Sequence, residues 1–357
     1  MGEAKTELFC KDAFSRPGPH FTETSPENKE KVRNAIRAHF PEVFGSLDFD
    51  VFAVEGNELN SKNFLVKTRT EEQPKQAFLK VLCAEEAGKL ESIAKMHALL
   101  HERGLPVAPV MPNLHGRLVA HERDACWMMT QRMIGHYFSG NSTSALLHAG
   151  QLYAQMKNVL SGIGDDVVGK ERIEFLHGDE EQILGEVKSC GLGLMSMVGG
   201  EGATALHANR DILLQKTVES GFLGFYYVPG DCKRVYHDYH PHNLLENEGE
   251  ISAILDIGSV VFGSAAVSTS FCAFKLLRQH VCAQKSVQCA APTIREYCEI
   301  TGPDYTWQEF ARYSTIEVLR RVFIILRQAL RGDTRWCHNL PVQLRALHET
   351  EELFKVR

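Results

Sequence analysis

The chain has 357 residues, of which 44% are hydrophobic and 24% are charged, and its formal net charge at pH 7 is -6. Such a composition is typical of a globular protein with enough apolar side chains for one large domain or two ordinary ones. A mildly acidic chain lacks the basic surface that binding to nucleic-acid phosphates requires, so nucleic acid is excluded as the expected partner.

The first residues contain no apolar segment typical of a secretion signal, and no apolar run approaches the length of a membrane span. Ten cysteines are scattered along the chain without a C-x-x-C pair, which indicates reduced thiols and argues against a zinc or redox site. We therefore expect a cytoplasmic protein without a membrane partner, either a monomer or a homodimer.

Residues 1–25 include prolines among polar residues and show no periodicity, so we expect a flexible N-terminal tail or an arm lying on the surface. Ser25 followed by Pro26 predicts the start of a helix, because Ser caps helices well and Pro suits the first helical position. This helix is expected to end near His39.

The next segments predict strands joined by polar turns, followed by a helix. Apolar residues at helical spacing predict that helix over about 85–103, and Gly104 ends it. The expected strands cover residues 51–54, 63–68, 78–83, 117–120 and 126–130.

The turn between the first two of these strands contains Gly56, Asn60 and Ser61. Backbone amides and small polar side chains in such a loop can cover the phosphates of a nucleotide. The alternative is an ordinary surface hairpin, since the loop lacks a full G-x-G-x-x-G pattern.

The remainder of the chain is mainly helical in its patterning. The expected helices cover residues 144–160, 180–188, 208–220, 269–289, 292–301, 307–332 and 341–354.

The most informative stretch lies between the third and fourth of these helices. It places Asp238, Asn243 and Asp256 at the spacings D-x4-N and N-x12-D, the last residue following an apolar strand-like run over 251–255. A phosphoryl-transfer site needs this set, because the first Asp can orient and deprotonate an attacking hydroxyl while Asn and the second Asp hold Mg²⁺. The alternative is a polar turn that these side chains simply cap.

This stretch resembles the catalytic core of the aminoglycoside phosphotransferase and choline kinase superfamily, which are protein-kinase-like small-molecule kinases. The residues that match the family pattern H-G-D-x-H-P-x-N followed by I-D-x-G are Asp238, His240, Pro241, Asn243, Asp256 and Gly258. One departure concerns the family histidine two residues before the catalytic Asp. Tyr236 occupies that position here, and His237 is adjacent to the Asp, which bears on the geometry of the loop.

The resemblance implies an α+β, bilobal protein-kinase-like fold that uses ATP or another nucleoside triphosphate together with Mg²⁺. On this basis we divide the chain into the flexible tail 1–25, a nucleotide-binding N-terminal lobe and hinge over 26–135, and a helical C-terminal lobe over 136–357. The C-terminal lobe would carry the catalytic loop and the acceptor site.

Lys80 lies between apolar residues of an expected strand, where a kinase-like fold keeps the lysine that contacts the α- and β-phosphates. Its glutamate partner on the following helix has three candidates, Glu85, Glu86 and Glu91. We choose Glu91, because it lies within the helix and beside its apolar stripe, whereas the other two suit the helix N-terminus as favourable charges.

The resemblance also assigns the segment around Gln131 and Met133 to the hinge that receives adenine through backbone groups. It places His240 among the residues that bind the nucleotide, and it supports the loop with Gly56, Asn60 and Ser61 as the phosphate cover. The side chains of the hinge strand are equally compatible with plain core packing.

Two further segments imitate nucleotide motifs without the partners that the chemistry needs. Residues 164–170 fit G-x-x-x-x-G-K, but Glu171 replaces the hydroxyl residue that binds Mg²⁺, so Lys170 is expected to lie in a turn. Asp179 ends an H-G-D sequence but is followed by Leu184 where Asn is needed, so we expect a helix-capping residue on the surface.

The expected function is an ATP-dependent phosphotransferase acting on a hydroxyl of a small molecule, with a sugar, amino sugar or aminoglycoside-like acceptor preferred. Alternatives are an amino-alcohol kinase of the choline, ethanolamine or homoserine type, and a catalytically inactive pseudokinase scaffold. A protein kinase is disfavoured, because no D-F-G or A-P-E sequence is present and Ile257 follows the second aspartate.

Overall fold

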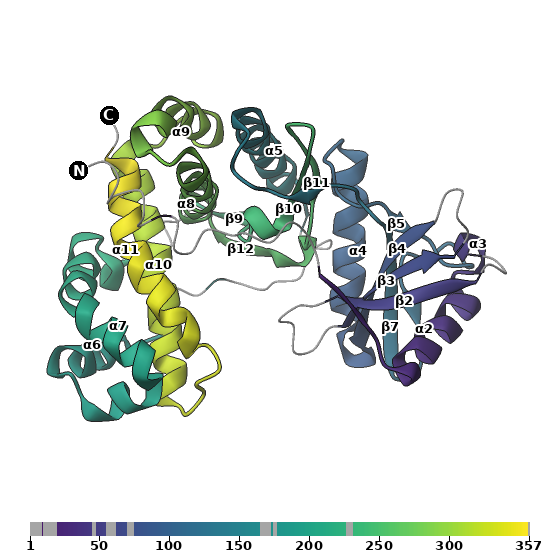
Figure 1. Cartoon of the computed structure of the whole chain (residues 1–357), viewed down its shortest axis with the longest axis horizontal. Helices are drawn as coiled ribbons and strands as arrows, with labels where there is room; N and C mark the ends of the chain where they lie inside the picture. The colour runs from purple at the N-terminus through teal and green to yellow at the C-terminus, as the bar shows by residue number, and fades with distance from the viewer. Residues whose placement is uncertain are drawn as a thin grey trace.

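The computed structural model describes residues 9, 20–44, 48–54, 62–69, 75–164, 173, 177–225 and 231–355. Two lobes are visible, an antiparallel sheet with its covering helices and a larger, mostly helical part (Figure 1). The predicted α+β, bilobal class is therefore confirmed.

The N-terminal lobe is built on one antiparallel sheet with the strand order β1-β2-β3-β4-β7-β5, and β6 pairs with β7. Its strands are β1 (Phe21–Glu23), β2 (Phe49–Val54), β3 (Lys62–Thr68), β4 (Gln76–Cys83), β5 (Val110–Met111), β6 (Ala120–His121) and β7 (Ala125–Gln131). Of the strand predicted over 117–120, only Ala120 forms one, because β6 covers Ala120–His121.

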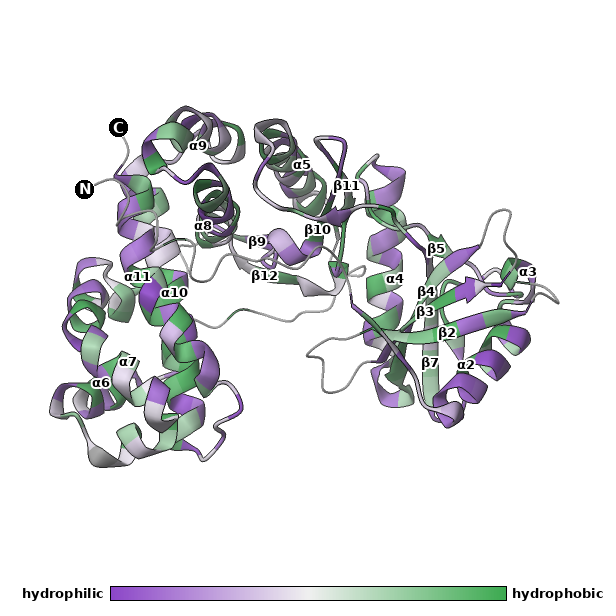
Figure 2. Ribbon diagram, in the orientation of Figure 1, coloured by the Kyte–Doolittle hydropathy of each residue, from purple (hydrophilic) through white to green (hydrophobic). Residues whose placement is uncertain are grey.

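Alternation along the strands explains why helices cover both faces of this sheet. In β7, Trp127 and Met129 belong to a core shared with α2 (Pro26–His39), whereas Cys126 and Met128 pack with α4 (Ala87–Glu102). Figure 2 shows mainly hydrophobic colours on the strands and mainly hydrophilic ones on the outer helix α2. A short helix α3 (Pro41–Phe44) follows α2.

The segment 1–25 contacts the rest of the fold at two described places. Residues 21–23 form β1, which pairs with β2 through Phe21 and Val54. Phe9 is fully buried in the core of the helical lobe. Burial of this apolar side chain is favoured by the hydrophobic effect.

The two lobes are joined through the segment after α4. Gly104 ends the helix with a positive φ of +79°, a conformation that glycine adopts without strain. The segment then runs beside β11 (Glu250–Ile254), where the backbone N–H of Ile254 donates to the carbonyl of Pro106 at 2.7 Å. Val107 also forms a parallel bridge with Ile254.

The helical lobe contains α5 (Thr143–Ser161), α6 (Glu180–Ser189), α7 (Leu192–Glu219), α8 (Ala265–Gln284), α9 (Val287–Thr301), α10 (Trp307–Leu330) and α11 (Leu340–Phe354). Its short strands are β8 (His136–Tyr137), β9 (Cys232–Tyr236), β10 (Leu244–Asn247), β11 and β12 (Val260–Ser264). The predicted helices are present, but three begin several residues earlier than predicted. The α7 helix begins well before residue 208 and kinks at Gly199. The α8 helix begins at Ala265 and ends at Gln284, before the predicted end at 289, and Pro292 lies inside α9.

No helix in the described part of the chain is long and apolar enough to span a membrane. The described cysteines are free thiols except Cys282, which is disulfide-bonded. The expectation of reduced cysteines is therefore wrong for this residue.

Candidate active site

The β10–β11 hairpin explains the N-x12-D spacing. Leu244 pairs with Ile254 in its antiparallel register, and the N–H of Leu255 donates to the carbonyl of Asn243 at 2.8 Å. The residues that flank these pairs, Asn243 and Asp256, are therefore brought to the same end of the hairpin. Twelve intervening residues are accounted for by two short strands and their turn.

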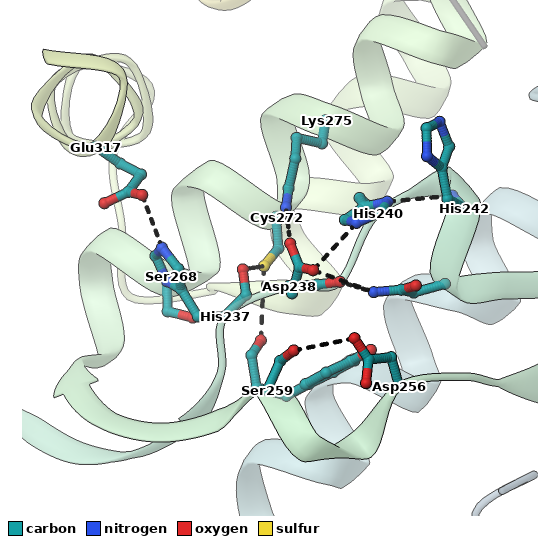
Figure 3. A network of polar contacts seen from close by, with 12 residues as sticks. His237, Asp238, His240, His242, Asp256, Ser259, Ser268, Cys272, Lys275 and Glu317 are labelled. Carbon is teal, nitrogen blue, oxygen red and sulfur yellow. Dashed lines mark hydrogen bonds and ion pairs between the residues drawn. The ribbon is translucent and has the colours of Figure 1, made fainter. Parts of the chain in front are cut away.

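Asp238 lies at the centre of a network of polar contacts (Figure 3). Its Oδ1 is 3.3 Å from Nζ of Lys275 on α8, and its Oδ2 is 3.3 Å from Nε2 of His240. Asn243 donates from Nδ2 to the backbone carbonyl of Asp238 at 2.9 Å and to its Oδ2 at 3.3 Å. Burial alone would raise the pKa of this carboxyl group, but Lys275 and His240 hold it well below its ordinary value.

His240 is itself largely buried, and burial lowers its pKa, followed by the influence of Lys275. Its Nδ1 accepts a hydrogen bond from the N–H of His242 at 3.2 Å, which leaves Nε2 as the nitrogen that faces Asp238. The neutral ring can thus donate to the carboxylate and fix its orientation.

Tyr236 replaces the histidine expected two residues before Asp238, and the structure gives it a definite role. The residue is buried, and its hydroxyl donates to the backbone carbonyl of Leu255, the residue directly before Asp256. The loop with Asp238 is therefore joined to the segment that carries Asp256.

His237 points in another direction, towards α10. Its Nε2 lies 2.9 Å from Oε1 of the fully buried Glu317, and its ring stacks on Phe271 with centroids 5.9 Å apart. Burial would raise the pKa of Glu317, but Arg320 and His237 hold it well below its ordinary value. His237 is therefore a support of the loop and does not face Asp256.

Asp256 adopts a left-handed backbone with φ 49° and ψ 52°, an uncommon conformation for a residue with a side chain. Such strained residues often occur where a side chain must point at a ligand. Its Oδ1 is 3.7 Å from Nζ of Lys80, and its Oδ2 accepts a hydrogen bond from the Ser259 hydroxyl at 3.4 Å.

The donor set of Asn243 and Asp256 fits Mg²⁺. Because the amide nitrogen of Asn243 is engaged with Asp238, its amide oxygen is the atom left to face a cation. Among the described residues, no three His, Cys, Asp or Glu side chains gather as a metal-binding group. One amide and one carboxylate suit a cation that takes its other ligands from phosphates and water.

Lys80 lies in β4, between Asn63 of β3 and Met128 of β7 in the sheet register. The predicted pairing with Glu91 is wrong, because the Glu91 carboxylate is half exposed and contacts Nε2 of His121 at 3.1 Å. None of the three candidate glutamates contacts Lys80 in the part of the chain that the structure describes, and Lys80 faces Asp256 instead.

The hinge segment follows β7. Gln131 donates its N–H to the carbonyl of Pro109 at 3.0 Å, and a proline has no N–H with which to return a bond. The Gln131 carbonyl therefore lacks the reciprocal partner that an antiparallel pair supplies. No described residue bonds the backbone of Met133.

Several predicted residues cannot be placed. Gly56, Asn60 and Ser61, and also Lys170, lie outside the described residues. Asp179 is described and precedes α6 as its N-cap residue, but its side chain does not cap the helix. It pairs with Arg327 instead, 2.6 Å away, so the expectation of an ordinary surface residue is wrong.

Sequence reasoning missed Lys275. Its side chain is only 13% exposed although its ammonium group is 3.3 Å from Asp238 and 4.7 Å from the centre of the Phe271 ring. A signal was present, because Lys275 interrupts a helix whose other residues from 265 to 274 are all buried. Lysine is rarely buried in this way without a charged partner.

No protein-family model matches the sequence, and no curated protein is significantly similar to it. Solved structures do match over most of their length, at low sequence identity.

A spectinomycin phosphotransferase in complex with ADP and spectinomycin has a TM-score of 0.60 at 12% identity, covering 93% of this chain and 98% of that chain. An amicoumacin kinase, hAmiN, in complex with AMP-PNP and Ca²⁺ has a TM-score of 0.56 at 14% identity, with coverages of 92% and 95%. A mutant aminoglycoside 2'-phosphotransferase-IIIa in its GDP complex has a TM-score of 0.54 at 14% identity, with coverages of 91% and 98%. The chain therefore has the protein-kinase-like fold of the aminoglycoside phosphotransferases.

Proposed function

We propose that this protein is an ATP-dependent phosphotransferase that transfers a phosphoryl group to a hydroxyl of a small molecule. One observation carries the proposal: Asp238, Asn243 and Asp256 converge at one end of the β10–β11 hairpin, with Lys80 3.7 Å from Asp256. A general base, a cation site and a phosphate-binding lysine are the parts that phosphoryl transfer requires.

In this proposal Asp238 accepts the proton of the acceptor hydroxyl. Its carboxyl group stays ionised because its pKa is held below its ordinary value, and His240 and Asn243 fix its orientation. Asn243 and Asp256 would hold Mg²⁺, which supplies charge neutralisation to the nucleotide phosphates when bound. Lys80 would bind the phosphates from the sheet side.

The adenine ring would lie against the hinge. The carbonyl of Gln131 is available to a ligand, because Pro109 accepts from Gln131 but has no N–H to donate in return. The N–H of Met133 has no partner among the described residues. These two groups supply one acceptor and one donor, the pair that the adenine edge requires. The solved structures of this fold that contain ADP, AMP-PNP or GDP support a nucleotide ligand in general terms.

The acceptor is proposed to be a sugar, amino sugar or aminoglycoside-like molecule. The structural neighbours that contain spectinomycin and amicoumacin support this class, since both are small molecules phosphorylated on this fold. An amino-alcohol kinase remains the alternative enzyme. A pseudokinase is disfavoured, because Lys80, Asp238, Asn243 and Asp256 are all present.

The test is a screen for ADP release from Mg²⁺ and ATP over sugars, amino sugars, aminoglycosides and amino alcohols, with Asp238→Asn as the inactive control. We expect acceptor-dependent ADP release by the wild type and its loss in the control. Tight AMP-PNP binding without acceptor-dependent ADP release from any member of the screen would favour a pseudokinase.

A further inference from the structure

The charge of the site is unequal on the two sides of Asp238. Figure 3 shows Asp256 on one side of this residue, and Lys275 and Glu317 on the other. The side with Asp256 is the nucleotide side in the proposed function. The opposite side is where an acceptor hydroxyl must approach, because donor and acceptor oxygens lie in line with the transferred group.

Among the described residues of this acceptor side, the cations Lys275, Arg320 and Arg321 lie near the carboxylates of Asp238 and Glu317. Lys275 forms an ion pair with Asp238, and Arg320 donates two hydrogen bonds of 2.7 and 2.8 Å to Glu317. Arg321 donates only its Nε to Glu317, at 2.9 Å. Arg321 therefore shares Glu317 with Arg320, and this contact uses only its Nε.

Arg321 is positioned to bind a ligand. Its guanidinium group lies 4.6 Å from the centre of the Phe271 ring, the same ring that Lys275 approaches at 4.7 Å. Its side chain is 31% exposed, and its two terminal nitrogens have no partner among the described residues. A guanidinium group held by one nitrogen and by an aromatic ring presents the other two as a fork suited to carboxylate or phosphate.

We infer that the acceptor carries an anionic group, a carboxylate or a phosphate ester, near the hydroxyl that is phosphorylated, and that Arg321 binds this anion beside Lys275. The inference rests on the proposed phosphotransferase function. Within the acceptor class proposed above, it favours sugars and amino sugars that carry an acidic group over polycationic aminoglycosides, which the same cations would repel.

The test uses the full chain and does not require the natural acceptor. The nucleotide site is first filled with Mg²⁺ and AMP-PNP, and inorganic phosphate or glycerate is then titrated by calorimetry. Phosphate and glycerate distinguish a phosphate-selective site from a carboxylate-selective one. We expect saturable binding that Arg321→Gln weakens by about tenfold or more, because a bidentate charged contact is lost.

Two variants serve as controls. Arg321→Lys keeps the charge but not the fork, so it should recover part of the affinity. Arg331→Gln removes an arginine that is 71% exposed and pairs with Asp179, so it should leave the titration unchanged. Unfolding by urea is measured for each variant, and Glu317 keeps its two bonds to Arg320 in all of them.

Three results would overturn the inference. The first is an equal affinity for the anions in wild type and Arg321→Gln, and the second is no anion binding by the wild type. The third is binding with Mg²⁺ and ADP that disappears with AMP-PNP, since Arg321 would then serve the transferred phosphoryl group. Failure of Mg²⁺ and AMP-PNP to bind at all would instead contradict the proposed function, on which the inference depends.

Discussion

Asp238 combines two properties that a general base needs, a fixed orientation and a constant charge. His240 and Asn243 hold its Oδ2, and Lys275 keeps the pKa of the carboxyl group low despite burial. The carboxylate therefore stays ionised to a lower pH than an ordinary aspartate, so an acidic limb in the activity profile near the usual carboxyl pKa should not come from Asp238.

The first prediction concerns this residue. Asp238→Asn keeps the size of the side chain but removes its basicity, so kcat should fall by about 10² to 10⁴-fold. Nucleotide affinity should remain nearly unchanged, because Asp238 is not expected to touch the nucleotide. Steady-state kinetics with the preferred acceptor and AMP-PNP titration measure the two effects. A fall in kcat of less than about fivefold in a folded variant would contradict the assignment.

The second prediction concerns Asp256. Replacing it by Ala removes the single carboxylate of the proposed cation site, so the Mg²⁺ concentration needed for half-maximal activity should rise by about tenfold or more. Mg²⁺ is titrated at fixed ATP. Ser259→Ala is the matched control, because it removes only a hydrogen bond to Oδ2 of Asp256 and should shift the curve far less. Superimposable curves for Asp256→Ala and wild type would refute the site.

At the scale of elements, α6 is fastened to α10 by a cluster of charges. Arg327 on α10 contacts Asp179 at 2.6 Å and the buried Glu180 at 2.7 Å. Glu180 also accepts hydrogen bonds from the backbone N–H groups of His177 and Gly178. The H-G-D sequence is therefore part of a helix start that is tied to a neighbouring helix.

A third prediction follows for this cluster. Arg327→Met leaves Glu180 buried without its cation, which should reduce the free energy of unfolding by about 3 kcal/mol. Asp179→Asn should cost about 1 kcal/mol, because Asp179 is more exposed and Glu180 keeps its partner. Urea unfolding measures both, with the exposed Arg331→Gln as the control. Neither variant should change kcat/KM for ATP in the folded protein, and a loss comparable with that of Lys80→Ala would show that the H-G-D segment belongs to the active site.

The elements that were predicted well depend on local patterns. The helix after Ser25 is predicted from its N-cap residue, and the β10–β11 hairpin from the short spacing between Asn243 and Asp256. Both signals are local in sequence. The start of α7 was missed because glycines at 191, 193, 199, 200 and 202 lower the helix propensity of that segment. Packing against α10 and α11 stabilises it in the fold, and this contribution is not local.

At the scale of the whole molecule, the junction of the lobes contains a buried histidine. Nδ1 of His97, on α4, lies 3.0 Å from the carbonyl oxygen of Ala108, which belongs to the segment that joins the lobes. Burial lowers the pKa of His97 to about 4. The unfolded chain binds a proton at this residue below its ordinary pKa of 6.5, whereas the folded protein does not.

The fourth prediction is a pH dependence of stability. Because the unfolded state binds the proton first, the free energy of unfolding should decrease as pH falls from about 6.5 to 4, by up to about 3 kcal/mol for His97 alone. His97→Gln keeps a hydrogen-bond donor but does not titrate. The difference in slope between wild type and this variant, from urea unfolding at several pH values, isolates the effect. Parallel slopes would contradict it.

Tertiary packing also explains which site residues the sequence did not reveal. Asp238, Asn243 and Asp256 were identifiable because one hairpin brings them together, and Lys80 because its strand is apolar on both sides. Lys275 comes from a helix that follows in sequence and reaches Asp238 only through the packing of α8 beneath the loop. The choice of Glu91 was wrong because sequence gives the spacing along α4 but not the rotation of the helix about its axis.

The hydrogen bond from the Tyr236 hydroxyl to the Leu255 carbonyl also bears on how the positions of Asp238 and Asp256 respond to a change of pH. A histidine in this position would change its charge near neutral pH. Burial raises the pKa of the Tyr236 phenol well above 10, so this hydroxyl keeps its proton throughout the physiological range. The separation of Asp238, the proposed base, from Asp256, the proposed cation ligand, is thus governed by a connection that does not titrate. Activity should therefore reflect the ionisation of acceptor and nucleotide more than that of the loop with Asp238.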